Sequence, residues 1–205
     1  MKLPERVRSW TSDRDYIDSQ RKDSSWNHRS AFGEFSAQKF IKYGEVLRKE
    51  GLLYHDDKVA DFGGNDGFCS NAFYLIHKIK PLVIDCEPDR LLYATEVYKL
   101  KTLQCFIEEI PLPDKYVDWG FCSHTLEHTR DPVKALREMS RLVKRGMLLV
   151  VPLEGKEHAR CNTAHSLSSP TMLQWKQLIG DSGVWAIKKS KRICGTEAIF
   201  WMLPV

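Results

Sequence analysis

The sequence predicts an α/β fold: a mostly parallel sheet covered by helices on both faces and ending in a β-hairpin. Short apolar runs alternate with helical stretches between about residues 58 and 151, a pattern typical of buried parallel strands joined by helices. Two strand-like segments, 184–191 and 197–203, then follow one another across a short turn. At 205 residues the chain is expected to form one core. We expect residues 1–50 to form a helical cap and residues 51–205 the main domain.

The individual elements follow from hydrophobic spacing and from turn residues. Apolar side chains recur at helical spacing from Ala31 to Lys49, which predicts an amphipathic helix. The strands before the hairpin are expected at Lys58–Phe62, Pro81–Asp85, Leu103–Ile107, Val117–Cys122 and Met147–Val151. Prolines at first helical positions and glycines at ends predict helices at about Phe68–His77, Pro88–Tyr98, Pro132–Arg145 and Ser168–Ser182.

Composition is that of an ordinary globular protein, with 42% hydrophobic residues and a mean hydropathy of -0.40. No stretch approaches the ~20 apolar residues of a membrane span. The segment Met1–Arg6 has no apolar run after its basic residues, so no secretory signal is expected. The expected compartment is cytoplasmic.

The six cysteines are scattered, with no CxxC pair, so neither a metal site nor a disulfide framework is predicted. The net charge is a mild +4. Its one dense basic run, Lys188–Arg192, is interpreted as a solvated strand face, and nucleic acid is not an expected partner.

A glycine-rich turn between the first strand and the following helix carries the main functional signal. It comprises Asp61, Phe62, Gly63, Gly64, Asn65, Asp66 and Gly67. Such turns let the backbone approach a ligand closely and direct free helix N–H groups at its polar end. The spacing differs from the GxGxxG of nicotinamide-binding folds. Because Asp61 would repel a pyrophosphate, the turn favours a ligand that carries an ammonium and a sulfonium.

A second carboxylate, Asp85, ends the second strand. A carboxylate at this strand tip can accept hydrogen bonds from both ribose hydroxyls. Glu87 is the second candidate for this role, although a helix-capping role suits Glu87 better than Asp85.

These motifs resemble those of class I S-adenosylmethionine-dependent methyltransferases. Asp61, Gly63 and Gly67 match the family's D-x-G-x-G-x-G, with Asn65 in place of the middle glycine; Asn tolerates left-handed backbone angles well. The run 122–132, CSHTLEHTRDP, resembles the small-molecule branch related to quinone-biosynthesis enzymes.

The resemblance spans about residues 58–152. It implies a Rossmann-like methyltransferase fold with a seven-stranded sheet, and S-adenosyl-L-methionine as cofactor. It also implies cofactor contacts from Phe62, Cys86, Ile107, Glu108 and Ser123. Ile107 and Glu108 would flank the adenine, although Phe106 stands at the family's usual aspartate position.

Methyl transfer from a sulfonium requires mainly that the acceptor be placed in line. A hydroxyl or amine acceptor would also benefit from a base, for which histidine is suited. His124, Glu154, His158 and His165 are the candidates, because they follow strand ends at the ligand-binding edge. The last three lie in a polar loop, Glu154–Ser168, which the resemblance implies to be an acceptor loop. His128 is expected to be structural, and Cys122 is not expected to act as a nucleophile.

Three functions remain open at this stage. The first is methylation of an oxygen, nitrogen or carbon of a small organic molecule, favoured by the modest chain length. The second is the same chemistry on RNA or protein, favoured only by the basic run. The third is a non-catalytic partner subunit, for which Asn65 and Phe106 are the only support. The sequence does not predict an oligomeric state.

Overall fold

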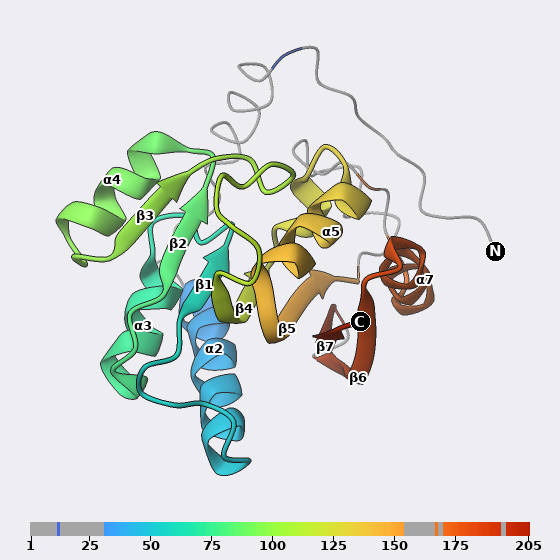
Figure 1. The fold of residues 1–205 in the computed structure, drawn as a ribbon, viewed down its shortest axis with the longest axis horizontal. Helices are drawn as coiled ribbons and strands as arrows, with labels where there is room; N and C mark the ends of the chain where they lie inside the picture. The colour runs from blue at the N-terminus through green and yellow to red at the C-terminus, as the bar shows by residue number, and fades with distance from the viewer. Residues whose placement is uncertain (1–11, 13–30, 154–166, 168–169, 194–195) are drawn as a thin grey trace.

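A computed structural model of the chain describes residues 12, 31–153, 167, 170–193 and 196–205. The elements are α2 (Ala31–Lys49), β1 (Val59–Phe62), α3 (Phe68–His77), β2 (Leu82–Asp85), α4 (Pro88–Glu96), β3 (Lys101–Gln104), β4 (Val117–Ser123), η1 (Leu126–His128), α5 (Pro132–Leu142), β5 (Val143–Pro152), α7 (Met172–Ser182), β6 (Trp185–Ile193) and β7 (Glu197–Pro204). Figure 1 shows them arranged around one central sheet.

The sheet has seven strands in the order β3-β2-β1-β4-β5-β7-β6. The strands from β3 to β5 are parallel, and β7 pairs antiparallel with both β5 and β6. The prediction of a mostly parallel seven-stranded sheet that ends in a β-hairpin is therefore confirmed. The chain order reverses direction between β1 and β4, and open α/β sheets bind ligands outside the carboxyl ends of the strands at such a point.

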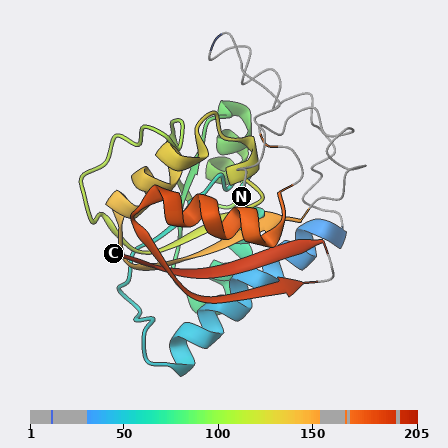
Figure 2. The same ribbon diagram turned by 90° about the vertical axis from the view of Figure 1, so that its right-hand side faces the viewer.

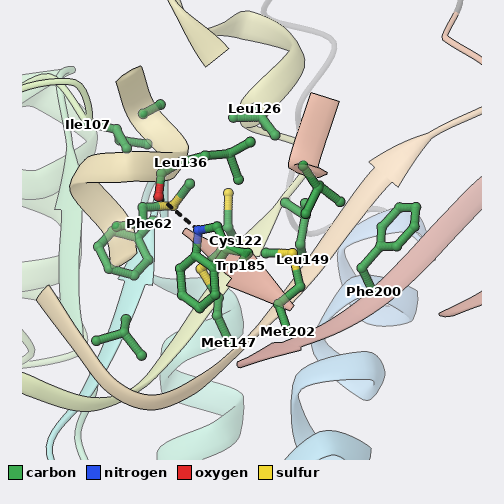
Figure 3. Packing of buried hydrophobic residues seen from close by; sticks show 14 of the residues in the cluster. Phe62, Ile107, Cys122, Leu126, Leu136, Met147, Leu149, Trp185, Phe200 and Met202 are labelled. Atoms are coloured by element: carbon green, nitrogen blue, oxygen red, sulfur yellow. Dashed lines mark hydrogen bonds between the residues drawn. The ribbon is translucent and has the colours of Figure 1, made fainter. Parts of the chain in front are cut away.

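Each face of the sheet has its own hydrophobic core. One face packs against α5 and α7 through a cluster that includes Leu136, Trp175 and Phe200. In Figure 3 the Trp185 indole lies within this cluster, and its N–H donates to the Leu136 carbonyl at 2.8 Å. Helices α5 and α7 thus cover this face, and α2 and α3 cover the other, so helices lie on both faces as predicted.

The opposite face packs against α2 and α3. Figure 2 shows α2 on the far side of the sheet from α5 and α7. Phe40 of α2 is fully buried against Phe121, with ring centroids 4.5 Å apart. The amphipathic helix predicted from Ala31 to Lys49 is confirmed, and its apolar side forms part of the core.

Several predicted element boundaries are wrong: α4 ends at Glu96 and not at Tyr98, and β5 begins at Val143 and not at Met147. Three further differences have a clear physical reason. The third strand is Lys101–Gln104 instead of 103–107, because it pairs residue for residue with the four residues of β2. The helix predicted to run to Arg145 ends at Leu142, since Val143 already pairs with Val117 of β4. The last helix begins after Thr171, where Thr171 and Gln174 form a capping box.

Candidate cofactor and acceptor site

The glycine-rich turn is held against β2 by a set of backbone contacts. The N–H groups of Gly63 and Gly64 donate to the Ile84 carbonyl at 2.7 and 3.2 Å. The Asn65 N–H donates to the Asp85 carboxylate at 2.9 Å. Asn65 adopts a left-handed φ of 54°, which asparagine accommodates better than most residues. The replacement of the family's middle glycine therefore preserves the turn.

The turn is also packed closely against β4. A Cβ on Gly63 would lie 2.2 Å from the Thr125 side chain, and a Cβ on Gly64 would lie 2.8 Å from the Asp61 carboxyl group. Any side chain at these positions would collide with these neighbours. Gly63 therefore allows the turn to approach Thr125, which follows β4, and Gly64 allows it to approach Asp61.

Asp61 lies beneath the turn and is 2% exposed. Its carboxylate accepts a hydrogen bond from the Ser70 hydroxyl of α3 at 2.7 Å. Burial raises the pKa of Asp61 to about 7, although the Ser70 hydrogen bond lowers it. Asp61 therefore changes charge near neutral pH.

Asp85 accepts hydrogen bonds from two backbone N–H groups, those of Asn65 at 2.9 Å and Glu87 at 3.0 Å. Burial raises its pKa, and these hydrogen bonds oppose the rise. Glu87 instead caps α4, where its carboxylate accepts from the Asp89 N–H. The structure thus uses Glu87 as a helix cap and leaves Asp85 at the strand tip.

Several predicted cofactor positions have a structural role. Phe62 and Ile107 are buried in the core. Glu108 accepts hydrogen bonds from the Arg130 and Asp131 N–H groups at 2.7 and 3.3 Å and so supports the loop before α5. The Arg130 guanidinium lies 4.1 Å from the Phe106 ring centroid. The adenine contacts of Ile107 and Glu108 stay a prediction.

Cys86 and Ser123 lie at the ends of β2 and β4. Cys86 is half-buried and directly follows Asp85. The Ser123 hydroxyl oxygen is buried and has no hydrogen-bond partner among the described residues. A buried hydroxyl at the switch point is a polar group that a bound ligand could satisfy.

His124 is the one predicted base that the structure describes. Its Nε2 lies 2.8 Å from Glu197, and its Nδ1 lies 3.5 Å from Glu127. Glu197 also contacts the Lys39 ammonium at 2.5 Å. His158 and His165 lie outside the described residues, as do the Glu154–Ser166 part of the predicted acceptor loop and the first thirty residues apart from Ser12.

Sequence reasoning did not single out Lys39 or Glu197. Lys39 has Phe35 and Tyr43 four residues away on either side, so it lies on the apolar side of its helix. Glu197 begins an otherwise apolar strand. A charged residue within an apolar pattern indicates a buried charge, and this signal could have identified both residues from the sequence.

The carboxylates and the turn at the strand ends fit a cationic nucleoside. Two carboxylates, Asp61 and Asp85, end neighbouring strands beside a glycine-rich turn, and Asp85 raises the pKa of Asp61. This arrangement favours a ligand that brings positive charge and sugar hydroxyls, and it disfavours a pyrophosphate. Among the described residues, no group of His, Cys, Asp and Glu is placed to hold a metal ion.

The fold and the site define a nucleoside-binding α/β protein of the Rossmann-like class. Comparison with known families is more specific, because residues 60–151 match the model of a methyltransferase domain. Residues 60–151 are therefore similar to a methyltransferase domain, and the resemblance to S-adenosylmethionine-dependent methyltransferases is confirmed.

Among curated proteins, the chloroplastic 2-methyl-6-phytyl-1,4-hydroquinone methyltransferase of Arabidopsis thaliana is 30% identical over 108 residues. This stretch covers 50% of the present chain and 31% of that relative. The chain thus matches about a third of the relative's length.

Solved structures share the fold at lower identity. An S-adenosylmethionine-dependent methyltransferase from Aquifex aeolicus is 20% identical with a TM-score of 0.60, covering 93% of this chain and 98% of its own. The cyclase SpnF is 12% identical with a TM-score of 0.67 and 80% coverage of both chains. Since one of these proteins is named for a different reaction, the shared fold alone does not define the reaction of the present chain.

None of the helices in the described residues is long and apolar enough to cross a membrane. The basic residues Lys188, Lys189, Lys191 and Arg192 are exposed on β6, an outer strand of the sheet. Lysines on an outer strand discourage pairing with other chains. The ammonium groups of Lys188 and Lys189 also lie 4.2 and 5.4 Å from the centroid of the Trp201 ring. These contacts support the interpretation of the run as a strand face.

Proposed function

We propose that the protein is an S-adenosyl-L-methionine-dependent methyltransferase that methylates an oxygen, nitrogen or carbon of a small organic acceptor. The observation that carries the proposal is the pair of carboxylates near the β1 and β2 tips, Asp61 and Asp85, beside a glycine-rich turn whose Asn65 N–H donates to Asp85. The methyltransferase-domain match over residues 60–151 supports the same conclusion. When bound, the cofactor supplies an activated methyl group on a sulfonium.

The chain's own residues bind and orient the two reactants. Asp85 accepts hydrogen bonds from the ribose hydroxyls, while Asp61 and the turn hold the amino-acid tail. The Ser123 hydroxyl is buried at the switch point. It forms a hydrogen bond with a bound reactant, as donor or as acceptor. Placing the acceptor in line with the methyl group supplies most of the rate enhancement.

A hydroxyl or amine acceptor must also lose a proton. We assign this role to His158 or His165, because both ring nitrogens of His124 face carboxylates. A small acceptor is favoured by the relative that is named for a hydroquinone. The expected site of action is the cytoplasm.

The first experiment identifies any nucleoside that copurifies with the protein, by mass spectrometry. Calorimetry then compares S-adenosylmethionine and S-adenosylhomocysteine with a nicotinamide dinucleotide. Binding of the first two alone supports the proposal, while preference for the dinucleotide contradicts it. A chain that binds none of them is the non-catalytic partner.

The acceptor class is tested separately, by release of S-adenosylhomocysteine from panels of phenols, amines and quinols and from RNA. Turnover with a small molecule supports the proposal. Turnover on RNA, accompanied by strongly salt-dependent binding, would favour the macromolecular alternative.

A further inference from the structure

A buried chain of four charged or titratable side chains lies beside the β4 tip. Lys39, Glu197, His124 and Glu127 follow one another, with contacts of 2.5, 2.8 and 3.5 Å. Their side chains are between 1 and 7% exposed. Such groups are costly to bury unless they are paired, so their mutual arrangement is closely constrained.

The four residues come from three distant parts of the sequence. Lys39 is on α2, His124 follows β4, Glu127 is in η1 and Glu197 begins β7. Lys39 and Glu197 both lie outside the matched residues 60–151. The charge chain thus connects the methyltransferase domain to the segments on either side of it.

The geometry around His124 indicates a fixed imidazolium. Nε2 lies within hydrogen-bond distance of Glu197, and Nδ1 lies 3.5 Å from Glu127, so a positive charge on the ring is attracted by a carboxylate on either side. Burial lowers the pKa of His124, but the hydrogen bonds and charges of Glu127 and Glu197 outweigh this effect and raise it. Among the described residues, the remaining charged group of this cluster is Lys39, which contacts the far oxygen of Glu197.

The position of His124 bears on the cofactor turn through Thr125. His124 has a left-handed φ of 52°, a conformation that needs support in a non-glycine residue. Its neighbour Thr125 packs against Gly63 and donates to the Ser123 carbonyl at 3.1 Å. A rotation of the His124 backbone would therefore move the side chain that supports the glycine-rich turn.

We propose that Glu197 is a positioning residue, which fixes the His124 ring between two carboxylates and thereby holds the β4 tip in the shape that the cofactor turn requires. The two carboxylates carry one negative charge more than the His124 imidazolium offsets, and the ammonium of Lys39 on α2 balances it. His124 is then a fixed cation and not the base of the reaction. The effect on cofactor affinity rests on the proposed function, whereas the charge state of His124 does not.

The test combines proton NMR titration of the His124 ring with calorimetry of S-adenosylhomocysteine binding. The ring signal is assigned by its loss in His124→Gln. In Glu197→Gln we expect the titration midpoint to fall by about one pH unit or more, and the dissociation constant to rise about 3- to 10-fold. Glu197→Asp should restore part of both.

Two further variants separate this role from a general loss of structure. Lys39→Gln removes a nearby cation, so the His124 midpoint should rise, opposite to its change in Glu197→Gln. Glu50→Gln is the matched control, because Glu50 lies 3.8 Å from Lys188 and also links the end of α2 to the hairpin. It should change neither the midpoint nor the affinity.

The results distinguish this proposal from the proposed function. A His124 midpoint that is the same in wild type, Glu197→Gln and Lys39→Gln overturns the positioning role. A shifted midpoint with unchanged affinity also overturns it, because the turn would then be independent of the charge chain. A wild-type protein that binds no S-adenosylhomocysteine contradicts the proposed function, and the NMR titration still decides the charge state of His124.

Discussion

Asp61 and Asp85 end adjacent parallel strands, and the protein supports them differently. Asp85 receives two backbone N–H groups, whereas Asp61 receives one side-chain hydroxyl. Backbone donors stabilise the ionised form of a carboxylate. We therefore expect Asp85 to act as a permanent hydrogen-bond acceptor and Asp61 as a group whose charge depends on its surroundings.

Replacing Asp85 with asparagine should weaken cofactor binding about 10- to 100-fold, because a charged hydrogen-bond acceptor is lost. Calorimetry with S-adenosylhomocysteine measures the change. Asp118→Asn is the control, since Asp118 is near the amino-terminal end of β4, away from the strand ends that carry the site, and pairs with Lys144. An unchanged dissociation constant in Asp85→Asn would remove Asp85 from the site.

Asp61 should make the unliganded protein less stable as the pH rises. The pKa of this carboxyl is about 7 in the folded protein, against an ordinary value of 3.8. Between these values the folded state binds more protons than the unfolded state, so stability falls as pH rises. The loss is complete above about pH 7 and amounts to a few kcal/mol, at ~1.4 kcal/mol per pH unit.

Asp61→Asn keeps the shape of the protonated carboxyl and removes its ionisation. We expect the variant to match the wild type at and below about pH 4, to be more stable near pH 8 and to bind cofactor more weakly. Denaturant unfolding at a series of pH values measures the difference between the two proteins. If wild type and variant lose stability in parallel with pH, Asp61 does not titrate in this range.

At the residue scale, sequence reasoning found the groups that depend on local chain order. Asp61, Asn65 and Asp85 stand at fixed offsets from strand ends, so their neighbourhood could be predicted. Glu197 and His124 are 73 residues apart, and their contact depends on the antiparallel pairing of β7 with β5. No local pattern specifies that register, which is why the charge chain was not predicted.

A glycine can be required for its left-handed backbone angles or for close packing, and two glycines at helix ends separate these two properties. Gly67, at the start of α3, and Gly183, at the end of α7, both have left-handed backbone angles, with φ of 78° and 72°. A Cβ on Gly67 would lie 2.9 Å from the Ala94 Cβ and 3.0 Å from Leu100, whereas a Cβ on Gly183 would meet nothing within 4 Å. The two positions therefore separate backbone strain from close packing.

Gly183→Ala should lower the free energy of unfolding by about 1–2 kcal/mol through backbone strain alone. Gly67→Ala should cost about 1–3 kcal/mol more, because α4 must also shift. Denaturant unfolding gives both values. Equal losses in the two variants would mean that the close approach of α3 to α4 contributes nothing.

Element types were easier to predict than element ends. Periodicity identified the parallel strands and the amphipathic helices, because each reflects one buried face. The end of α5 was missed since Val143 joins β5 through its pairing with Val117, a tertiary contact. The start of α7 is different, because the Thr171 and Gln174 capping box is visible in the sequence and was overlooked in favour of the serines before Pro170.

On the scale of the whole molecule, α2 contributes to the core beneath the sheet. Phe40 and Leu47 are fully buried, and Tyr43 contacts the rings of Trp119, Phe121 and Trp201. A lid that opens over a ligand would have to leave this core. We therefore propose that α2 is a fixed layer of the domain and not a movable lid.

Phe40→Ala decides between a fixed layer and a detachable lid. If α2 is part of the cooperative core, the variant should lose about 3–5 kcal/mol of unfolding free energy, as for other buried phenylalanines. Val46→Ala is the control on the same helix, because Val46 is 41% exposed and should change stability by no more than about 0.5 kcal/mol. Denaturant unfolding, followed by tryptophan fluorescence, measures both. A main transition that stays in place in Phe40→Ala, with a separate early loss of helical signal, would show instead that α2 unfolds alone and can act as a lid.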